Sequence, residues 1–263
     1  MLQFIFGLPL SGKTETILEK AKELSENGGK SVIIVPEQYT FETEKRVLNT
    51  LGNSFALNVQ VLSFSRLYDE IFNKIGGMSS QLLGDSDKVI FMNKALKQVS
   101  VDLKLWGKYA KSLFFARTML DTVGEFKING ITASDLENAA QKAESQSLKQ
   151  KLIELKVIIE TYDALISERY IDPADKLAKV YESLLDYKYF ENKTVFFDGF
   201  KGFTGQQFKI IDRVFSQAEN VYIAFTNDLS CKREYDVFTN IRLATKKIEK
   251  YGYNQTFDVV EDN

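Results

Sequence analysis

The spacing of apolar residues divides the chain into three stretches. In the first, short apolar runs at 4–6, 31–35 and 57–62 predict three strands. Helical patterns lie between them, the second from Thr40 to about Leu51. Runs that are apolar throughout are typical of parallel strands buried on both faces. This stretch therefore predicts a β-α-β-α-β unit with helices covering a parallel sheet.

The second stretch, from Phe64 to about Tyr187, keeps helical spacing and has no segment with a clear strand pattern. Gly76–Ser80 is rich in Gly and Ser and predicts a loop near its start. Ser134 with Glu137 three residues later predicts a capping box. These features indicate a helical subdomain whose apolar stripes face its own core.

Strand character returns in the third stretch, at Thr194–Phe197 and Asn220–Phe225, with a weaker strand at 256–260. One interrupted sheet is simpler than two half-sheets, because separate halves would leave unpaired edges. We therefore expect a discontinuous α/β domain formed by 1–66 and 190–263, with a helical insertion subdomain at 67–189.

The first strand runs into the pattern G-x-x-x-x-G-K-T, and a helical pattern follows it. Glycines let backbone N–H groups wrap phosphate oxygens, and the helix N-terminus adds partial positive charge. A lysine here reaches the β- and γ-phosphates, and a hydroxyl holds Mg²⁺. We expect Gly7, Ser11, Gly12, Lys13 and Thr14 to bind a nucleotide such as ATP. The alternative is a Gly-rich turn with an exposed lysine.

Asp198 directly follows the buried strand at 194–197 and is the candidate to complete the Mg²⁺ site with Thr14. Its alternative role is a turn residue that caps the next helix. Gly199 follows, so no side chain there can serve as a neighbouring catalytic base. Gln38 is a candidate to contact the nucleotide, and Glu37 is a weak candidate base. Other polar candidates near strand ends are Gln206 and Gln207.

The amino-acid composition excludes several kinds of catalytic and metal site. The chain has 263 residues, 44% of them apolar, and a formal charge of −2, so it has no global basic field for nucleic acid. It contains no histidine, which excludes His-based catalysis and His metal sites. Its single cysteine, Cys231, excludes an internal disulfide and a cysteine-ligated cluster. No apolar stretch approaches the ~20 residues of a membrane span. We expect a cytoplasmic protein.

Three motifs together resemble a known family. They are the N-terminal phosphate loop, Ile34–Phe41 after the second strand, and Phe197–Thr204 after the fourth. They resemble the B subunit of the ATP-dependent helicase/deoxyribonuclease complex, the AddB family. The similarity extends over essentially the whole chain. Glu125–Lys127 and Asp172–Leu177 are also similar to its helical region.

The resemblance implies a RecA-like, superfamily-1 helicase domain 1A with a helical 1B insertion. It implies a role in processing double-strand DNA breaks for recombination and repair, with the A subunit as the ATP-driven motor partner. Asp198-Gly199 and Lys201 depart from the motor pattern and agree with a subunit that is not a motor. By analogy, Ser63, Ser65 and Arg66 contact DNA phosphate; their alternative is a helix cap with a surface charge.

The resemblance also implies what the chain lacks. The family's nuclease domain, iron–sulfur cluster and second RecA-like domain lie further along, so we expect an N-terminal fragment with neither nuclease nor helicase activity. Two alternatives stay open: a stand-alone P-loop ATPase or kinase, and an interaction scaffold with a non-functional loop. A kinase lid needs clustered arginines, whereas 64–187 contains only Arg66, Arg117 and Arg169.

Overall fold

The computed structural model describes residues 1–76, 81–228, 236–251 and 255–260. Most of the expected loop at 76–80 lies outside the described residues, as do Cys231 and the chain end at 261–263. The chain divides into two compact units. Unit 1 comprises 1–71, 179–203 and 207–263, and unit 2 comprises 72–178 and 204–206.

Unit 1 is built on a six-stranded sheet with the order β3-β2-β6-β7-β1-β8, in which every described pairing is parallel. This confirms the predicted α/β class with a parallel sheet. The strands are β1 (Leu2–Gly7), β2 (Lys30–Ile34), β3 (Val59–Leu62), β6 (Lys193–Phe197), β7 (Asn220–Thr226) and β8 (Gln255–Val259). Strands separated by more than a hundred residues are direct neighbours; Ile33 of β2 lies opposite Phe196 of β6.

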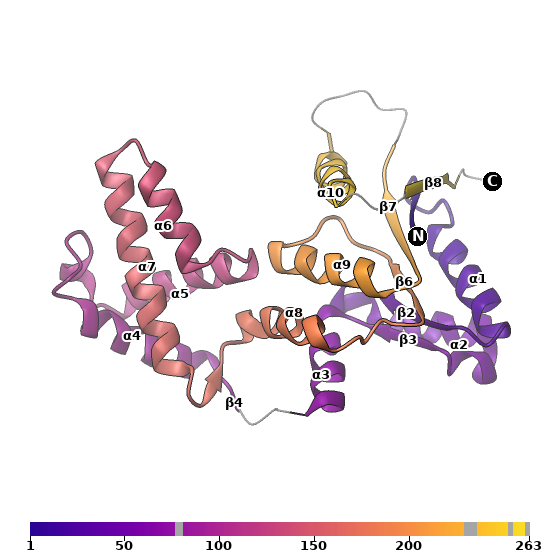
Figure 1. Cartoon of the computed structure of the whole chain (residues 1–263), viewed down its shortest axis with the longest axis horizontal. Coiled ribbons are helices and arrows are strands. Elements are labelled where there is room, and N and C mark those ends of the chain that lie inside the picture. The colour runs from indigo at the N-terminus through magenta and orange to yellow at the C-terminus, as the bar shows by residue number, and fades with distance from the viewer. Residues whose placement is uncertain (77–80, 229–235, 252–254, 261–263) are drawn as a thin grey trace. The chain divides into compact units, whose positions relative to one another are not determined.

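Helices cover both faces of this sheet, as the apolar strands require (Figure 1). On one face, Ile17 of α1 and Val47 of α2 pack in a core with Ile5 and Phe196 of the sheet. On the other face, aromatic rings of the strands, α3 and α9 pack in tilted and edge-to-face pairs, with Phe203 between β7 and α9. The helices assigned wholly or mostly to unit 1 are α1 (Lys13–Glu26), η1 (Glu37–Tyr39), α2 (Thr40–Ala56), α3 (Phe64–Ile75), α8 (Lys176–Asp186), α9 (Gly205–Gln217) and α10 (Thr239–Glu249).

Unit 2 is a helical unit with its own apolar core, centred on fully buried Met92, Leu96, Ile158 and Tyr162. Helix α7 contacts both α4 and α6, and α4 also contacts α5. Its elements are β4 (Gln81–Leu82), α4 (Asp85–Val99), η2 (Gly107–Tyr109), α5 (Leu113–Ile128), α6 (Ala133–Lys142), α7 (Gln146–Ile166), β5 (Tyr170–Ile171) and η3 (Pro173–Asp175).

Two local features of unit 2 differ from the sequence expectation. A short parallel pairing joins β4 to β5, where no strand was expected, because two-residue strands leave no periodic pattern. The expected capping box at Ser134 and Glu137 is wrong. The box is formed by Thr132 and Asp135. Helix α6 begins at Ala133, so its N-cap is Thr132, whereas a Ser134 N-cap would require the helix to begin later. No helix among the described residues is long and apolar enough to span a membrane.

Candidate nucleotide-binding site

The expected site elements follow the ends of neighbouring parallel strands. β1 ends at Gly7, β2 at Ile34, β3 at Leu62 and β6 at Phe197. Because the strands are parallel, the loops that follow them emerge at the same edge of the sheet, which is where ligands of such sheets bind. The phosphate loop, η1 and Asp198 therefore lie at one edge of the sheet of unit 1.

The loop after β1 depends on backbone conformations that few residues adopt. Gly12 has φ 92° and Leu10 has φ 67°, both in the left-handed region. Gly7 is needed for another reason: a Cβ there would lie 2.2 Å from Ser11 Oγ and 2.8 Å from the Val260 carbonyl oxygen. The close approach of Val260, just after β8, to the loop could not be read from the sequence. These constraints give a tightly curved loop that leads into α1.

The end of the loop that leads into α1 is positively charged. α1 begins at Lys13, and its N-cap residue, Gly12, supplies no side-chain hydrogen bond to the first turn. The amides of that turn are therefore available to an anion. The Lys13 ammonium folds back over the loop and donates to the Leu8 carbonyl and, at 3.3 Å, to Ser11 Oγ. Both features suit a phosphate group.

Thr14 and Asp198 meet beside this loop although 184 residues separate them in the sequence. Thr14 Oγ1 donates a 2.7 Å hydrogen bond to Asp198 Oδ2, and Asp198 is only 8% exposed. Burial raises the pKa of the Asp198 carboxyl, while the Thr14 hydroxyl, the Gly199 N–H and Lys13 act in the opposite direction. A hydroxyl and a buried carboxylate are oxygen ligands of the kind that Mg²⁺ takes.

The position after Asp198 disfavours a larger side chain. Gly199 has φ 77°, which disfavours any residue with a Cβ. A Cβ there would also lie 3.3 Å from the Tyr39 ring and 3.4 Å from Pro36 Cδ. The sequence showed that a glutamate is missing at this position. The structure adds that the backbone and Tyr39 leave little room for one.

The glutamine candidates lie in different places. Gln38 is exposed on η1, directly after β2, and among the described residues no hydrogen bond joins its side chain to the phosphate loop. Glu37 is also exposed. Gln206 is buried in unit 2, where its Nε2 donates to the carbonyl oxygens of Lys127 and Ala174. The side chain of Gln206 is thus engaged in holding unit 2 together.

The three candidate DNA contacts follow β3. Ser63 is buried and its Oγ accepts a 3.2 Å hydrogen bond from the Arg66 amide, so it caps α3. Ser65 is exposed. The Arg66 guanidinium forms an ion pair with Glu44 on α2 at 2.5 Å. Ser63 thus caps α3, as the alternative expects, and DNA contact by Ser63, Ser65 and Arg66 stays a prediction.

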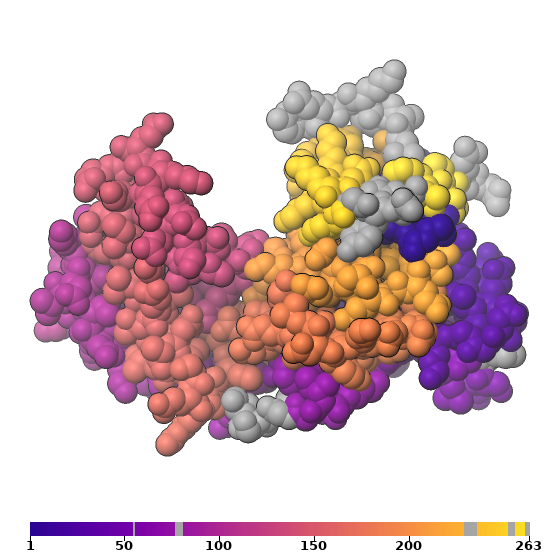
Figure 2. All heavy atoms as spheres, in the orientation of Figure 1, coloured from indigo at the N-terminus to yellow at the C-terminus, as the bar shows by residue number. Residues whose placement is uncertain are grey.

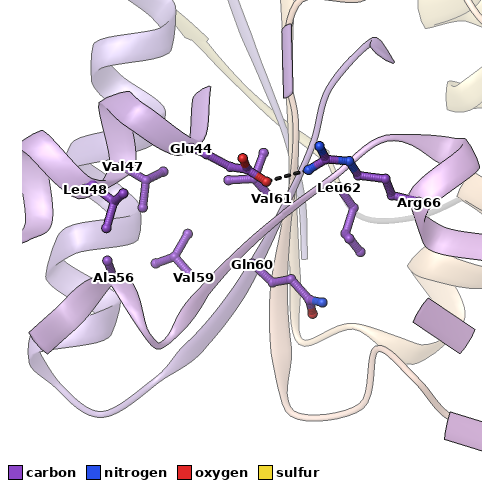
Figure 3. A pocket seen from close by; sticks show the side chains of 9 residues that line it. All are labelled: Glu44, Val47, Leu48, Ala56, Val59, Gln60, Val61, Leu62 and Arg66. Carbon is purple, nitrogen blue, oxygen red and sulfur yellow. Dashed lines mark hydrogen bonds and ion pairs between the residues drawn. The ribbon is translucent and has the colours of Figure 1, made fainter. Parts of the chain in front are cut away.

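An open hollow of about 470 Å³ lies beside this ion pair, between α2 and β3. Figure 3 shows Glu44 and Arg66 pointing toward each other across it. Most of its lining side chains are apolar, including Val47, Leu48 and Val61. It lacks the convergent cations that a phosphate requires. None of its lining residues comes from the phosphate loop.

These observations define a class: an α/β protein whose parallel sheet carries a glycine-containing loop before α1, with a hydroxyl–carboxylate pair beside it. Comparison with known proteins identifies the family. Residues 4–263 match the family described as "ADDB, N-terminal", and the chain belongs to this family.

Named relatives agree. The B subunit of the ATP-dependent helicase/deoxyribonuclease of Acetivibrio thermocellus is 32% identical over 254 residues, which are 95% of this chain and 22% of that protein. The protein of the same name from Clostridium acetobutylicum is 28% identical over 261 residues, covering 98% of this chain and 23% of the relative. The chain thus spans less than a quarter of the length of these relatives.

Proposed function

We propose that this chain is a nucleotide-holding, non-motor module of an AddB-type subunit, which binds Mg²⁺–ATP with little or no hydrolysis of its own. The observation that carries the proposal is the 2.7 Å hydrogen bond between Thr14 and Asp198 beside the phosphate loop. A buried carboxylate is costly unless it is compensated. A divalent cation would supply that compensation at this position.

The residues present suit such a ligand. The loop from Gly7 to Gly12 and the first turn of α1 offer backbone amides to phosphate, and Lys13 offers its ammonium. Thr14 and Asp198 would hold Mg²⁺, and exposed Gln38 would contact the nucleotide. When bound, Mg²⁺ would offset the negative charge of the phosphates. Ser11, whose Oγ already accepts from Lys13, would keep that ammonium over the loop.

Hydrolysis requires a group that orients or deprotonates water, and the described site offers no side chain at Gly199. Exposed Glu37 is the remaining carboxylate near the strand ends that we weigh for this role. We expect Glu37→Gln to leave any residual hydrolysis unchanged. A drop in hydrolysis in that variant would assign Glu37 as a base.

The relatives are named as subunits of a helicase/deoxyribonuclease. On that basis we propose that the module works inside a cytoplasmic complex that processes DNA ends for recombination and repair. A motor A subunit would be its partner, and DNA its substrate in the assembly. A RecA-like, superfamily-1 arrangement of unit 1, with the helical residues 67–189 as an insertion, belongs to the same proposal.

The test compares Mg²⁺–ATP binding and ATP hydrolysis on the same 263-residue chain, with and without single-stranded DNA. Calorimetry should show binding that Lys13→Ala weakens by about tenfold or more, because a charge-assisted hydrogen bond is lost. The matched variant Lys22→Ala, on the same helix but away from the loop, should bind as the wild type does. Turnover should stay well below the roughly 10 per second typical of enzymes.

Two results would overturn the proposal. Rapid turnover by the isolated chain would favour the stand-alone ATPase or kinase. Failure of both the wild type and Lys22→Ala to bind Mg²⁺–ATP would favour an interaction scaffold with a non-functional loop.

A further inference from the structure

The segment 101–117 of unit 2, between the end of α4 and the first turns of α5, differs in charge from the rest of the chain. It contains four basic residues and one acidic residue, whereas the whole chain has a formal charge of −2. The basic residues are Lys104, Lys108, Lys111 and Arg117, and all four are exposed. The segment lies at the molecular surface (Figure 2). We call it the 101–117 surface.

The four cations of the 101–117 surface form no ion pair with a carboxylate among the residues that the structure describes. Several other surface lysines behave differently. Lys88, Lys179 and Lys188 each pair with a carboxylate three residues away in the sequence. With four basic residues and one acidic residue, the 101–117 surface carries a local excess of positive charge.

Hydrogen bonds fold the middle of the segment into tight turns. The amides of Tyr109, Ala110 and Ser112 each donate to the carbonyl oxygen three residues earlier, at 2.9, 3.2 and 2.9 Å. These turns keep Lys108 and Lys111 on one short, exposed stretch of backbone. On α5, Phe114 and Arg117 lie three residues apart and are neighbours on the helix surface.

Exposed rings lie among these cations. Phe114 is 82% exposed and Tyr109 is 47% exposed. Lys108 Nζ lies 4.9 Å from the centre of the Tyr109 ring. Beneath them, Phe115 packs against Trp106 and Tyr109 with ring centres 6.1 and 5.9 Å apart. The exposed face of the Phe114 ring is therefore accessible to a ligand that can stack on it.

A buried carboxylate holds the backbone of the 101–117 surface in place through hydrogen bonds. Glu154 of α7 is 1% exposed and accepts from the amides of Leu105 and Trp106 at 2.9 and 3.1 Å. Gln150 donates to the same carboxylate at 2.9 Å. Fully buried Ala110 and Ala116 anchor the segment to the core. Because the backbone is held, a ligand would find the cations and rings already in place.

We propose that the 101–117 surface binds single-stranded nucleic acid. Lys104, Lys108, Lys111 and Arg117 contact its phosphates, and bases stack on Tyr109 and Phe114. Single strands expose the base faces that such rings need, and cations interleaved with aromatic side chains are typical of proteins that bind them. A duplex would use the cations but leave both rings uncovered. This surface is distinct from the phosphate loop, and it does not depend on nucleotide binding.

The test measures binding of fluorescently labelled oligothymidylate to the 263-residue chain by anisotropy, over a series of salt concentrations. The double variant Lys108→Glu/Lys111→Glu should bind at least tenfold more weakly. Its salt slope should be smaller by about 1.4, because each single-strand phosphate contact contributes roughly 0.7. Phe114→Ala should weaken binding about tenfold, through lost stacking, and leave the salt slope unchanged.

The matched control is Lys142→Glu/Lys149→Glu, which makes the same charge change at exposed lysines elsewhere in unit 2. It should bind as the wild type does, and so should Lys13→Ala, which separates this proposal from nucleotide binding. Circular dichroism of each variant verifies folding, and Phe114→Leu keeps the bulk of the side chain if Phe114→Ala unfolds.

Any of four results would overturn the proposal: no binding of oligothymidylate by the wild type, equal losses in the two double variants, a duplex that binds as tightly as the single strand, or polyglutamate that competes as well as the oligonucleotide. The last result would indicate an acidic protein surface as the partner.

Discussion

Each unit of this protein buries charged groups, and the two do so in opposite ways. In unit 1, Asp198 is buried beside a neutral hydroxyl, with Lys13 as a nearby charge. In unit 2, the Lys127 ammonium is 7% exposed and donates to Asp163 and Asp175, each at 2.6 Å. The first carboxylate is under-compensated and the second cluster is well paired. The difference separates a site suited to an added cation from a network that holds a fold together.

The pKa shifts of the carboxyls do not by themselves separate the two sites, because burial raises the pKa of Asp175 as well as that of Asp198. Burial alone lowers the pKa of Lys127, but Asp175 and Asp163 outweigh it and the net pKa is raised, so the ammonium stays charged. The Tyr162 hydroxyl donates to Asp172 at 3.1 Å and extends the network. At Asp198 the pKa is raised mainly by burial. The difference lies in the partners: Asp175 accepts from the Lys127 ammonium at 2.6 Å, whereas Asp198 accepts from the neutral Thr14 hydroxyl.

The largest expected effect tests the structural side of this comparison. Lys127→Met leaves the carboxylates of Asp163, Asp172 and Asp175 without their cation. We expect unit 2 to lose about 3–5 kcal/mol of unfolding free energy, measured by urea denaturation. Lys156→Met is the control, because its partners Glu137 and Glu160 are exposed and it should unfold nearly as the wild type does. Wild-type stability in Lys127→Met would contradict the structural role.

The next effect tests whether unit 1 could be turned into a motor site by one residue. Gly199→Glu restores the missing carboxylate but places a Cβ at φ 77° and against Tyr39. We expect no gain in ATP hydrolysis and a loss of about 1–2 kcal/mol in stability. Gly199→Ala should show the same backbone cost without the charge. Hydrolysis in Gly199→Glu at undiminished stability would show that only the side chain was lacking.

The smallest effect tests the cost of the under-compensated carboxylate. Because burial raises its pKa, folded Asp198 retains a proton above the ordinary value of 3.8, where the unfolded chain has released it. Wild-type stability therefore falls as pH rises through that window. Asp198→Asn removes this pH-dependent loss of stability. The variant should be about 1 kcal/mol more stable than the wild type at neutral pH. It should also lose Mg²⁺-dependent nucleotide binding.

The stability gain of Asp198→Asn should shrink as the pH is lowered through the window, and it should vanish once Asp198 is protonated in both states. Thermal unfolding from pH 3 to pH 7 measures this dependence. Exposed Asp186→Asn is the control and should show neither effect. A loss of stability at neutral pH in Asp198→Asn would mean that the carboxylate is already compensated in the ligand-free chain.

The sequence by itself determined the elements of the parallel sheet and the strand ends from which the site is built. Apolar runs such as 31–35 specify buried strands because burial on both faces leaves little choice of residue. Thr14 and Asp198 could be paired in advance, since both follow strand ends that a parallel sheet brings to one edge. Nucleotide binding at these residues remains a prediction that the experiments above test.

Only the tertiary structure decided what depends on contacts between distant segments. It showed that Gly7 is packed against Val260, that Tyr39 lies close to Gly199, and that Gln206 is engaged in unit 2. It also brought Glu154 beneath the 101–117 surface. Residue type and spacing indicate which local secondary structure a segment prefers. The roles of Gly7, Gly199 and Gln206 instead depend on residues that are distant in the sequence and that only folding brings into contact.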